Sequence, residues 1–138
     1  MGPSLRKSPK GFSGSAVQHL IPKGATVFMD MVLRNLDKCD VVAVSGRMDA
    51  VTAPEFEKQC LAWMEEGHKN FLLDFSSLEY ISSAGLRSIL GVAKKTKPLG
   101  GKVVLAGLTG VVAEVFSISG FDAFLPIVDT VEVGKEVF

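Results

Sequence analysis

FLLDFSSLEYISSAGLR, residues 71–87, is the most informative stretch of this 138-residue chain. Phe71-Leu72-Leu73 is a short apolar run of the kind found in the central strand of a sheet, and Asp74 follows it. Ser82-Ser83-Ala84-Gly85 then supplies small and polar residues where an amphipathic run begins, which is typical of a helix N-terminus. We therefore expect a strand that ends at Asp74, a loop, and a helix from near Ser83 to about Lys97.

Strands and helices alternate on both sides of this stretch. The expected elements are a strand at 27–33, a polar turn at 37–40, a strand at 41–44, a helix that begins with Thr52 and Glu55 as a capping box and ends at Gly67, a strand at 103–106, a helix from Thr109 or Gly110 to just before Gly120, a strand at 125–128, and a last helix capped by Asp129 or Thr130. An initial hairpin followed by this alternation indicates an α/β domain. We expect one mixed, mostly parallel sheet with an antiparallel N-terminal pair and helices packed mainly on one face.

The chain divides into a tail and one domain. Residues 1–25 are rich in Gly, Ser, Pro and Lys and show no sustained periodicity, so we expect a flexible N-terminal extension with a short ordered piece around Ala16–Ile21. Residues 26–138 are expected to form the domain, because 113 residues suit one hydrophobic core and leave no room for a second.

The charge balance argues against two classes of partner. Fifteen acidic and fifteen basic residues leave no overall field that would attract nucleic acid or an anionic membrane. No apolar run approaches the roughly 20 residues of a membrane span, and the N-terminus lacks the apolar stretch of a secretory signal. The sequence therefore predicts a cytoplasmic protein with neither nucleic acid nor membrane as its partner.

No constellation of residues predicts catalysis. Cys39 and Cys60 lack metal-ligand spacing and are expected to be buried or half-buried thiols in a reducing cytosol. His19 and His68 have no spaced carboxylate or thiol and are expected to be solvated loop residues. No glycine-rich loop precedes a helix, as a phosphate cradle would require. We expect no metal, no cofactor and no enzymatic activity.

Two readings remain open for the serines at the start of the second helix. Ser82 and Ser83 lie beside the unpaired backbone donors of a first helical turn and the positive end of its dipole, where a phosphate would find donors. Alternatively, Ser82 only caps the helix and Gly85 only permits close packing. Local physics alone favours this second reading slightly.

Three segments resemble the STAS family, to which bacterial anti-sigma factor antagonists belong. Residues 80–87, Tyr-Ile-Ser-Ser-Ala-Gly-Leu-Arg, are similar to its phosphorylation-site signature, with Asp74 and Ser76 at the preceding strand end. Residues 44–53 contain Gly-Arg-Met-Asp-Ala-Val-Thr-Ala, which resembles the family's segment between the second strand and the first helix. Residues 100–107 resemble its Gly-Gly turn and fourth strand. The three segments occur in family order.

The resemblance implies a partner-switching cycle and assigns its residues. The phosphoacceptor would be Ser83. At position 82 many relatives carry Asp, whereas this chain has Ser82, whose hydroxyl could compete with that of Ser83. The partner surface would comprise Asp49, Ser82, Ser83, Gly85, Leu86 and Arg87. The implied partners are an anti-sigma factor with serine kinase activity and a serine phosphatase, while the oligomeric state is left open. For Asp49 two roles stay open: that of a turn residue that satisfies backbone amides, and a direct role near the acceptor.

Two other functions also stay open. The same fold serves as an interaction module that senses a nucleotide or small ligand, and as a subunit of a signalling assembly whose target is not a sigma factor. No feature of the sequence separates these functions from partner switching.

Overall fold

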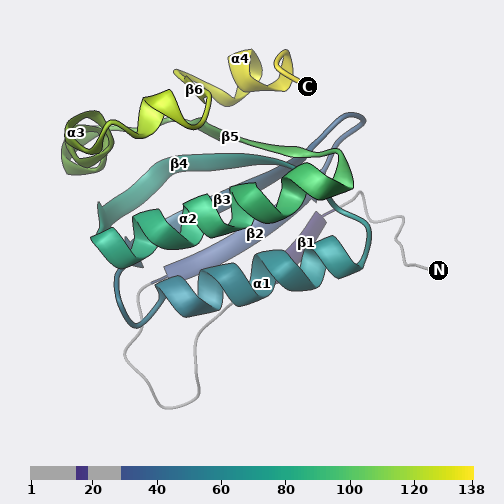
Figure 1. The fold of residues 1–138 in the computed structure, drawn as a ribbon, viewed down its shortest axis with the longest axis horizontal. Coiled ribbons are helices and arrows are strands. Elements are labelled where there is room, and N and C mark those ends of the chain that lie inside the picture. The colour runs from purple at the N-terminus through teal and green to yellow at the C-terminus, as the bar shows by residue number, and fades with distance from the viewer. Residues whose placement is uncertain (1–14, 19–28) are drawn as a thin grey trace.

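The computed structural model describes residues 15–18 and 29–138, and within 15–18 the backbone alone. The elements follow in this order: β1 (Ser15–Gln18), β2 (Met29–Asn35), β3 (Asp40–Met48), α1 (Ala53–Glu65), β4 (Asn70–Ile81), α2 (Ser83–Thr96), a 3₁₀ turn (Lys97–Leu99), β5 (Lys102–Ala106), α3 (Gly110–Ser119), a 3₁₀ turn (Phe121–Ala123), β6 (Ile127–Val128) and α4 (Val131–Lys135). The described strands form one sheet in the spatial order β1-β2-β3-β4-β5-β6. The pairs β1–β2 and β2–β3 are antiparallel, and the three pairs from β3 to β6 are parallel. This topology confirms the expected mixed α/β sheet (Figure 1).

Alternation along the strands divides the apolar side chains between two cores. On one face, Val42, Leu73 and Leu105 join the large core that also takes Phe56 of α1, Ile89 of α2 and Phe116 of α3. The other face carries a smaller cluster, in which strand residues pack against α4 and the chain end: Cys39, Val41, Leu72, Val104, Ala106, Val128, Val131, Val137 and Phe138. Three of the four described helices therefore cover one face, as expected, and Figure 1 shows α1 and α2 packed over the sheet on that side, running roughly along the strands.

The strand β4 is longer than the sequence indicated. The expected loop after Asp74 is wrong, because β4 continues to Ile81. Its pairing with β5 does end at Asp74, but β3 extends to Met48 and supplies backbone partners as far as Ile81. Two register shifts in this ladder, one after Ala43 and one after Gly46, interrupt the alternation that would have revealed the strand.

The expected N-terminal strand and tail are only partly within the described residues. The strand expected at 27–33 begins at Met29 in the described part of the chain, and His19 and residues 26–28 lie outside it. Within the proposed extension, Ser15–Gln18 forms β1 and pairs with Met31–Arg34 of β2, so one short piece of it belongs to the sheet. The limits of the domain, 26–138, stay a prediction.

His68 and Asp40, near the start of β3, form a pair that the sequence did not indicate. His68 was expected to be solvated, but its side chain is only 25% exposed and its Nδ1 lies 2.7 Å from Oδ2 of Asp40. Asp40 is buried as the first residue of β3 rather than placed in a turn. The hydrogen bond to Asp40 raises the pKa of His68, against the opposing effect of partial burial. Cys39 and Cys60 are both buried free thiols, as expected, and burial raises the pKa of each.

Candidate functional site at the start of α2

The two segments that suggested function lie side by side where β3 and β4 end. Arg47 is paired with Tyr80 and Met48 with Ile81 in the parallel ladder. The ladder is then closed by the N–H of Ser82, which donates to the carbonyl of Met48 at 2.9 Å. The turn before α1 and the first turn of α2 are thereby fixed to each other by backbone geometry.

Asp49 organises the turn between β3 and α1. Its Oδ1 accepts from the backbone N–H groups of Val51 at 3.0 Å and Thr52 at 3.1 Å. These hydrogen bonds favour the charged form, and the one from Thr52 is the largest reason that the pKa of Asp49 lies below its usual range. Asp49 thus acts as a turn residue that satisfies backbone amides, the first of the two roles expected for it.

Thr52 precedes α1, but its side chain does not cap the helix as the sequence suggested. Its hydroxyl donates to the carbonyl of Arg47 at 2.8 Å and accepts from the N–H of Asp49 at 2.9 Å. The expected capping box with Glu55 is therefore wrong, because the hydroxyl fastens the end of β3 to the turn.

Ser82 is the N-cap of α2 and its hydroxyl is already engaged. The backbone of Ser82 is extended, and its Oγ accepts a long hydrogen bond of 3.4 Å from the N–H of Gly85. The side chain is half-buried. Both features are those of a helix cap.

Ser83 is the first residue of α2 and is exposed. In the described part of the chain its hydroxyl has no hydrogen-bond partner, and the N–H groups of Ser83 and Ala84 have none either. Such orphan donors at a helix N-terminus, reinforced by the dipole, favour an anionic group attached nearby. The structure thus distinguishes the two serines: one hydroxyl serves the helix and the other faces solvent.

The remaining residues of the signature differ in accessibility. Gly85 is buried, and a Cβ there would lie 2.7 Å from Cγ1 of Ile81 and 3.1 Å from the carbonyl oxygen of Met48. Its contribution is therefore the close approach of α2 to the strand ends, with no side chain presented to a partner. Leu86 is half-buried at the edge of the large core, and Arg87 is exposed. Arg87 lies four residues after Ser83 and so on the same face of the helix.

Arg47 and Tyr80 complete the site, although sequence reasoning singled out neither as a functional residue. The guanidinium carbon of Arg47 lies 4.3 Å from the centre of the Tyr80 ring, and its Nε is 4.0 Å from Oδ2 of Asp49. Both residues stand inside the quoted segments. Their contact follows from the β3–β4 register, which the sequence did not reveal because β4 was expected to end earlier.

The sequence profile described as STAS domain matches residues 30–134, which is most of the chain. The chain belongs to the STAS domain family. BtrV of Bordetella bronchiseptica, which carries a provisional name as an anti-sigma factor antagonist, is 34% identical over 110 residues covering 80% of this chain and 95% of BtrV.

Solved structures resemble this STAS domain in fold. An anti-sigma factor antagonist from Mycobacterium paratuberculosis has a TM-score of 0.72 at 23% identity, with 79% of this chain and 92% of that one covered. The Bacillus cell fate determinant SpoIIAA, solved in its phosphorylated form, has a TM-score of 0.59 at 17% identity, with coverages of 78% and 99%.

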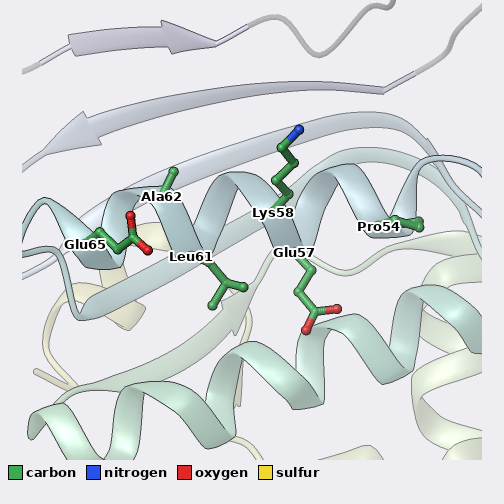
Figure 2. A pocket seen from close by; sticks show the side chains of 6 residues that line it. All are labelled: Pro54, Glu57, Lys58, Leu61, Ala62 and Glu65. Carbon is green, nitrogen blue, oxygen red and sulfur yellow. The ribbon is translucent and has the colours of Figure 1, made fainter.

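A shallow depression on α1 of the STAS domain is poorly suited to an anionic ligand. Figure 2 shows the six side chains that line it: Pro54, Glu57, Lys58, Leu61, Ala62 and Glu65. Two carboxylates against one ammonium give it a negative charge, which disfavours the phosphates of a nucleotide.

Among the described residues, no group of three His, Cys, Asp or Glu side chains could hold a metal ion. The described helices include none long and apolar enough to cross a membrane.

Proposed function

We propose that this STAS domain is a partner-switching regulator of the anti-sigma factor antagonist type, controlled by phosphorylation of Ser83. Unphosphorylated, it binds an anti-sigma factor that is also a serine kinase. Phosphorylation releases it, and a serine phosphatase restores the binding state. The observation that carries the proposal is the exposed, unengaged hydroxyl of Ser83 at the first position of α2, beside a Ser82 hydroxyl that caps the helix.

The chemistry of the switch needs no catalytic group from this chain. The Ser83 Oγ attacks the γ-phosphorus of ATP held by the kinase, the bond to the bridging oxygen breaks, and ADP leaves. The hydroxyl proton passes to a base on the kinase. The protein is substrate and ligand in this cycle, and it acts in the cytoplasm, where ATP and the kinase are present.

The consequence of phosphorylation is electrostatic. The phosphate places a charge of about −2 and three acceptor oxygens at a spot with unpaired backbone N–H groups. Arg87, one turn along the same face, can steady the phosphate or, in the unphosphorylated form, pair with a carboxylate of the partner. Because the added charge must be desolvated in a complex, it weakens the interface with the kinase.

Substitutions at the two serines test this assignment. Ser83→Ala should abolish phosphate incorporation by the kinase and keep its affinity, because one hydroxyl is lost from an otherwise intact surface. Ser83→Asp should weaken binding by about 10- to 100-fold, because a carboxylate at the interface carries a desolvation penalty. The measurements are transfer of labelled phosphate from ATP and titration calorimetry with the purified kinase.

Ser82→Ala is the matched control one residue away. It should lower helix stability by about 1 kcal/mol through loss of the cap and leave phosphorylation at Ser83 in place. Phosphate mapped to Ser82 by mass spectrometry would move the assignment by one residue. If the kinase modifies neither serine and Asp at both positions leaves binding unchanged, the switch is rejected. Saturable binding of a nucleotide by the pure protein would then favour a ligand-sensing module.

A further inference from the structure

Three large apolar side chains are exposed on α3 and in the turn that follows it. Val111, Ile118 and Phe124 are 57%, 86% and 66% exposed, although residues of these types are usually buried. Val111 and Ile118 are seven residues apart, so they share one face of α3. We call these three residues the α3 patch.

The α3 patch lies at the same end of the sheet as Ser83. β6 pairs only with Leu105 and Ala106, the last two residues of β5, so the chain between β5 and β6 remains near the carboxyl end of the parallel strands. α2 also begins at this end, after β4. Figure 1 shows α3 and the start of α2 at the same end of the molecule.

Phe124 of the α3 patch is connected to the core by a series of aromatic contacts. The rings of Phe75 and Phe116 are 6.3 Å apart, those of Phe116 and Phe121 5.3 Å, and those of Phe121 and Phe124 6.4 Å. This series runs from buried β4 to the exposed Phe124. A supported aromatic side chain loses little entropy when a partner covers it, which is a property of residues that dominate binding energy.

The charges around the patch indicate what kind of surface fits it. Residues 103–134 contain four acidic and no basic residues. Two of the acids, Glu114 and Asp122, are exposed on α3 and in the turn before Phe124. A second copy of the chain would bring carboxylates against carboxylates, and anionic nucleic acid or lipid would be repelled. The complement is an apolar protein surface rimmed by lysine or arginine.

We infer that the α3 patch is the apolar anchor of the interface whose switch is Ser83, and that the kinase covers it with an apolar, basic-rimmed surface. This inference rests on the proposed function. A stable interface buries roughly 800 Å² on each partner and gains most of its energy from a few well-packed apolar or aromatic residues. The exposed residues at the start of α2 are the polar Ser83 and Arg87, so this region suits control of the interface better than anchorage.

The test compares matched exposed apolar residues with the purified kinase as the binding probe. The double variant Ile118→Ser/Phe124→Ser should bind at least tenfold more weakly, with an unchanged circular dichroism spectrum. Val133→Ser, a side chain 52% exposed on α4, should bind within about twofold of wild type. In a second arm, Glu114→Lys should slow association at low salt, whereas Glu132→Lys on α4 should not.

The possible outcomes separate the inference from the proposed function. If Ser83→Asp weakens binding but the double variant binds like wild type, the inference fails and the proposed function stands. If wild type does not bind the kinase, or if neither serine is phosphorylated and Asp at both positions leaves binding unchanged, both fail. A wild-type dimer in sedimentation that the double variant abolishes would identify a second copy as the occupant and overturn the inference. A loss of affinity in the double variant, with Val133→Ser binding like wild type, supports the inference.

Discussion

Gly85 and Gly91 of α2 face different neighbours, so the same substitution should have opposite effects. A Cβ at Gly85 would meet the backbone carbonyl of Met48 at 3.1 Å and Cγ1 of Ile81 at 2.7 Å. Replacing Gly by Ala within a helix gains about 1 kcal/mol, but overpacking costs about 1–3 kcal/mol. We expect Gly85→Ala to lower the free energy of unfolding by about 1 kcal/mol, measured by urea denaturation.

Gly91→Ala is the control in the same helix. Its Cβ would meet only the carboxylate end of Glu57, at 3.1 Å, and that flexible side chain can move. Figure 2 shows Glu57 extending from α1 toward this neighbouring helix. We therefore expect Gly91→Ala to raise the free energy of unfolding by up to about 1 kcal/mol. Equal effects at the two glycines would show that α2 does not approach the strand ends as closely as the structure has it.

At the scale of elements, deletion of the first strand tests where the domain begins. β1, Ser15–Gln18, is an edge strand of four residues, whereas the family profile matches residues 30–134. Removal of residues 1–25 deletes β1 and leaves β2 to β6 in place. We expect the thermal unfolding midpoint to fall by only a few degrees, because one short edge strand is lost.

A second truncation separates β1 from the residues before it. Removal of residues 1–14 should leave the midpoint unchanged if β1 accounts for the whole effect of the longer deletion. A fall of more than about 15 °C on removal of residues 1–25 would show that the extension is part of the folded domain.

The sequence predicted elements well where each carries its own signal. Apolar runs and helix ends located α2 and β5, and the cap at Thr130 is confirmed by its hydrogen bond to the N–H of Val133. The second half of β4 was missed because Ser76 and Ser77 break the alternation and because β3 is its only partner among the described strands. The fate of the Thr52 hydroxyl and the pairing of His68 with Asp40 depend on contacts between segments, which periodicity does not report.

At the candidate site, the resemblance to the STAS family identified the two serines, and the structure shows how their hydroxyls differ. Local sequence gave Ser82 and Ser83 similar standing, since both stand at a helix start. The distinction arises from geometry, because only Ser82 has the extended backbone that turns its hydroxyl toward the N–H of Gly85. That a partner kinase phosphorylates Ser83 remains a proposal, and so does the choice of Ser83 over Ser82.

At the scale of the whole molecule, the strand β3 separates two ends that hold different contacts. β3 begins at Asp40, which holds His68, and ends at Met48, which binds Ser82. Nine residues of strand place these ends about 25 Å apart. A change at the His68 end should therefore alter stability without altering binding at the Ser83 end.

The pH dependence of unfolding measures how much the His68–Asp40 pair contributes to stability. Hydrogen bonding to Asp40, with a smaller contribution from the charge of Glu66, raises the folded-state pKa of His68 above its ordinary value of 6.5. A raised pKa means that the stabilisation is fully present below the unfolded-state pKa and is lost as the pH rises through the folded-state pKa. In urea titrations from about pH 5.5 to 9, the stability advantage of wild type over His68→Gln should shrink as the pH rises.

The same variant tests whether the two ends are independent. Gln keeps a hydrogen-bond donor for Asp40 but cannot carry the positive charge, so the pH-dependent part of the stability should disappear while the fold is retained. Because Ser83 and its neighbours lie at the far end of β3, the affinity of His68→Gln for the proposed partner kinase should match wild type across the same pH range. An advantage of wild type that stays constant with pH would contradict the ion pair. A parallel change in kinase affinity would show that β3 couples the His68 pair to the switch.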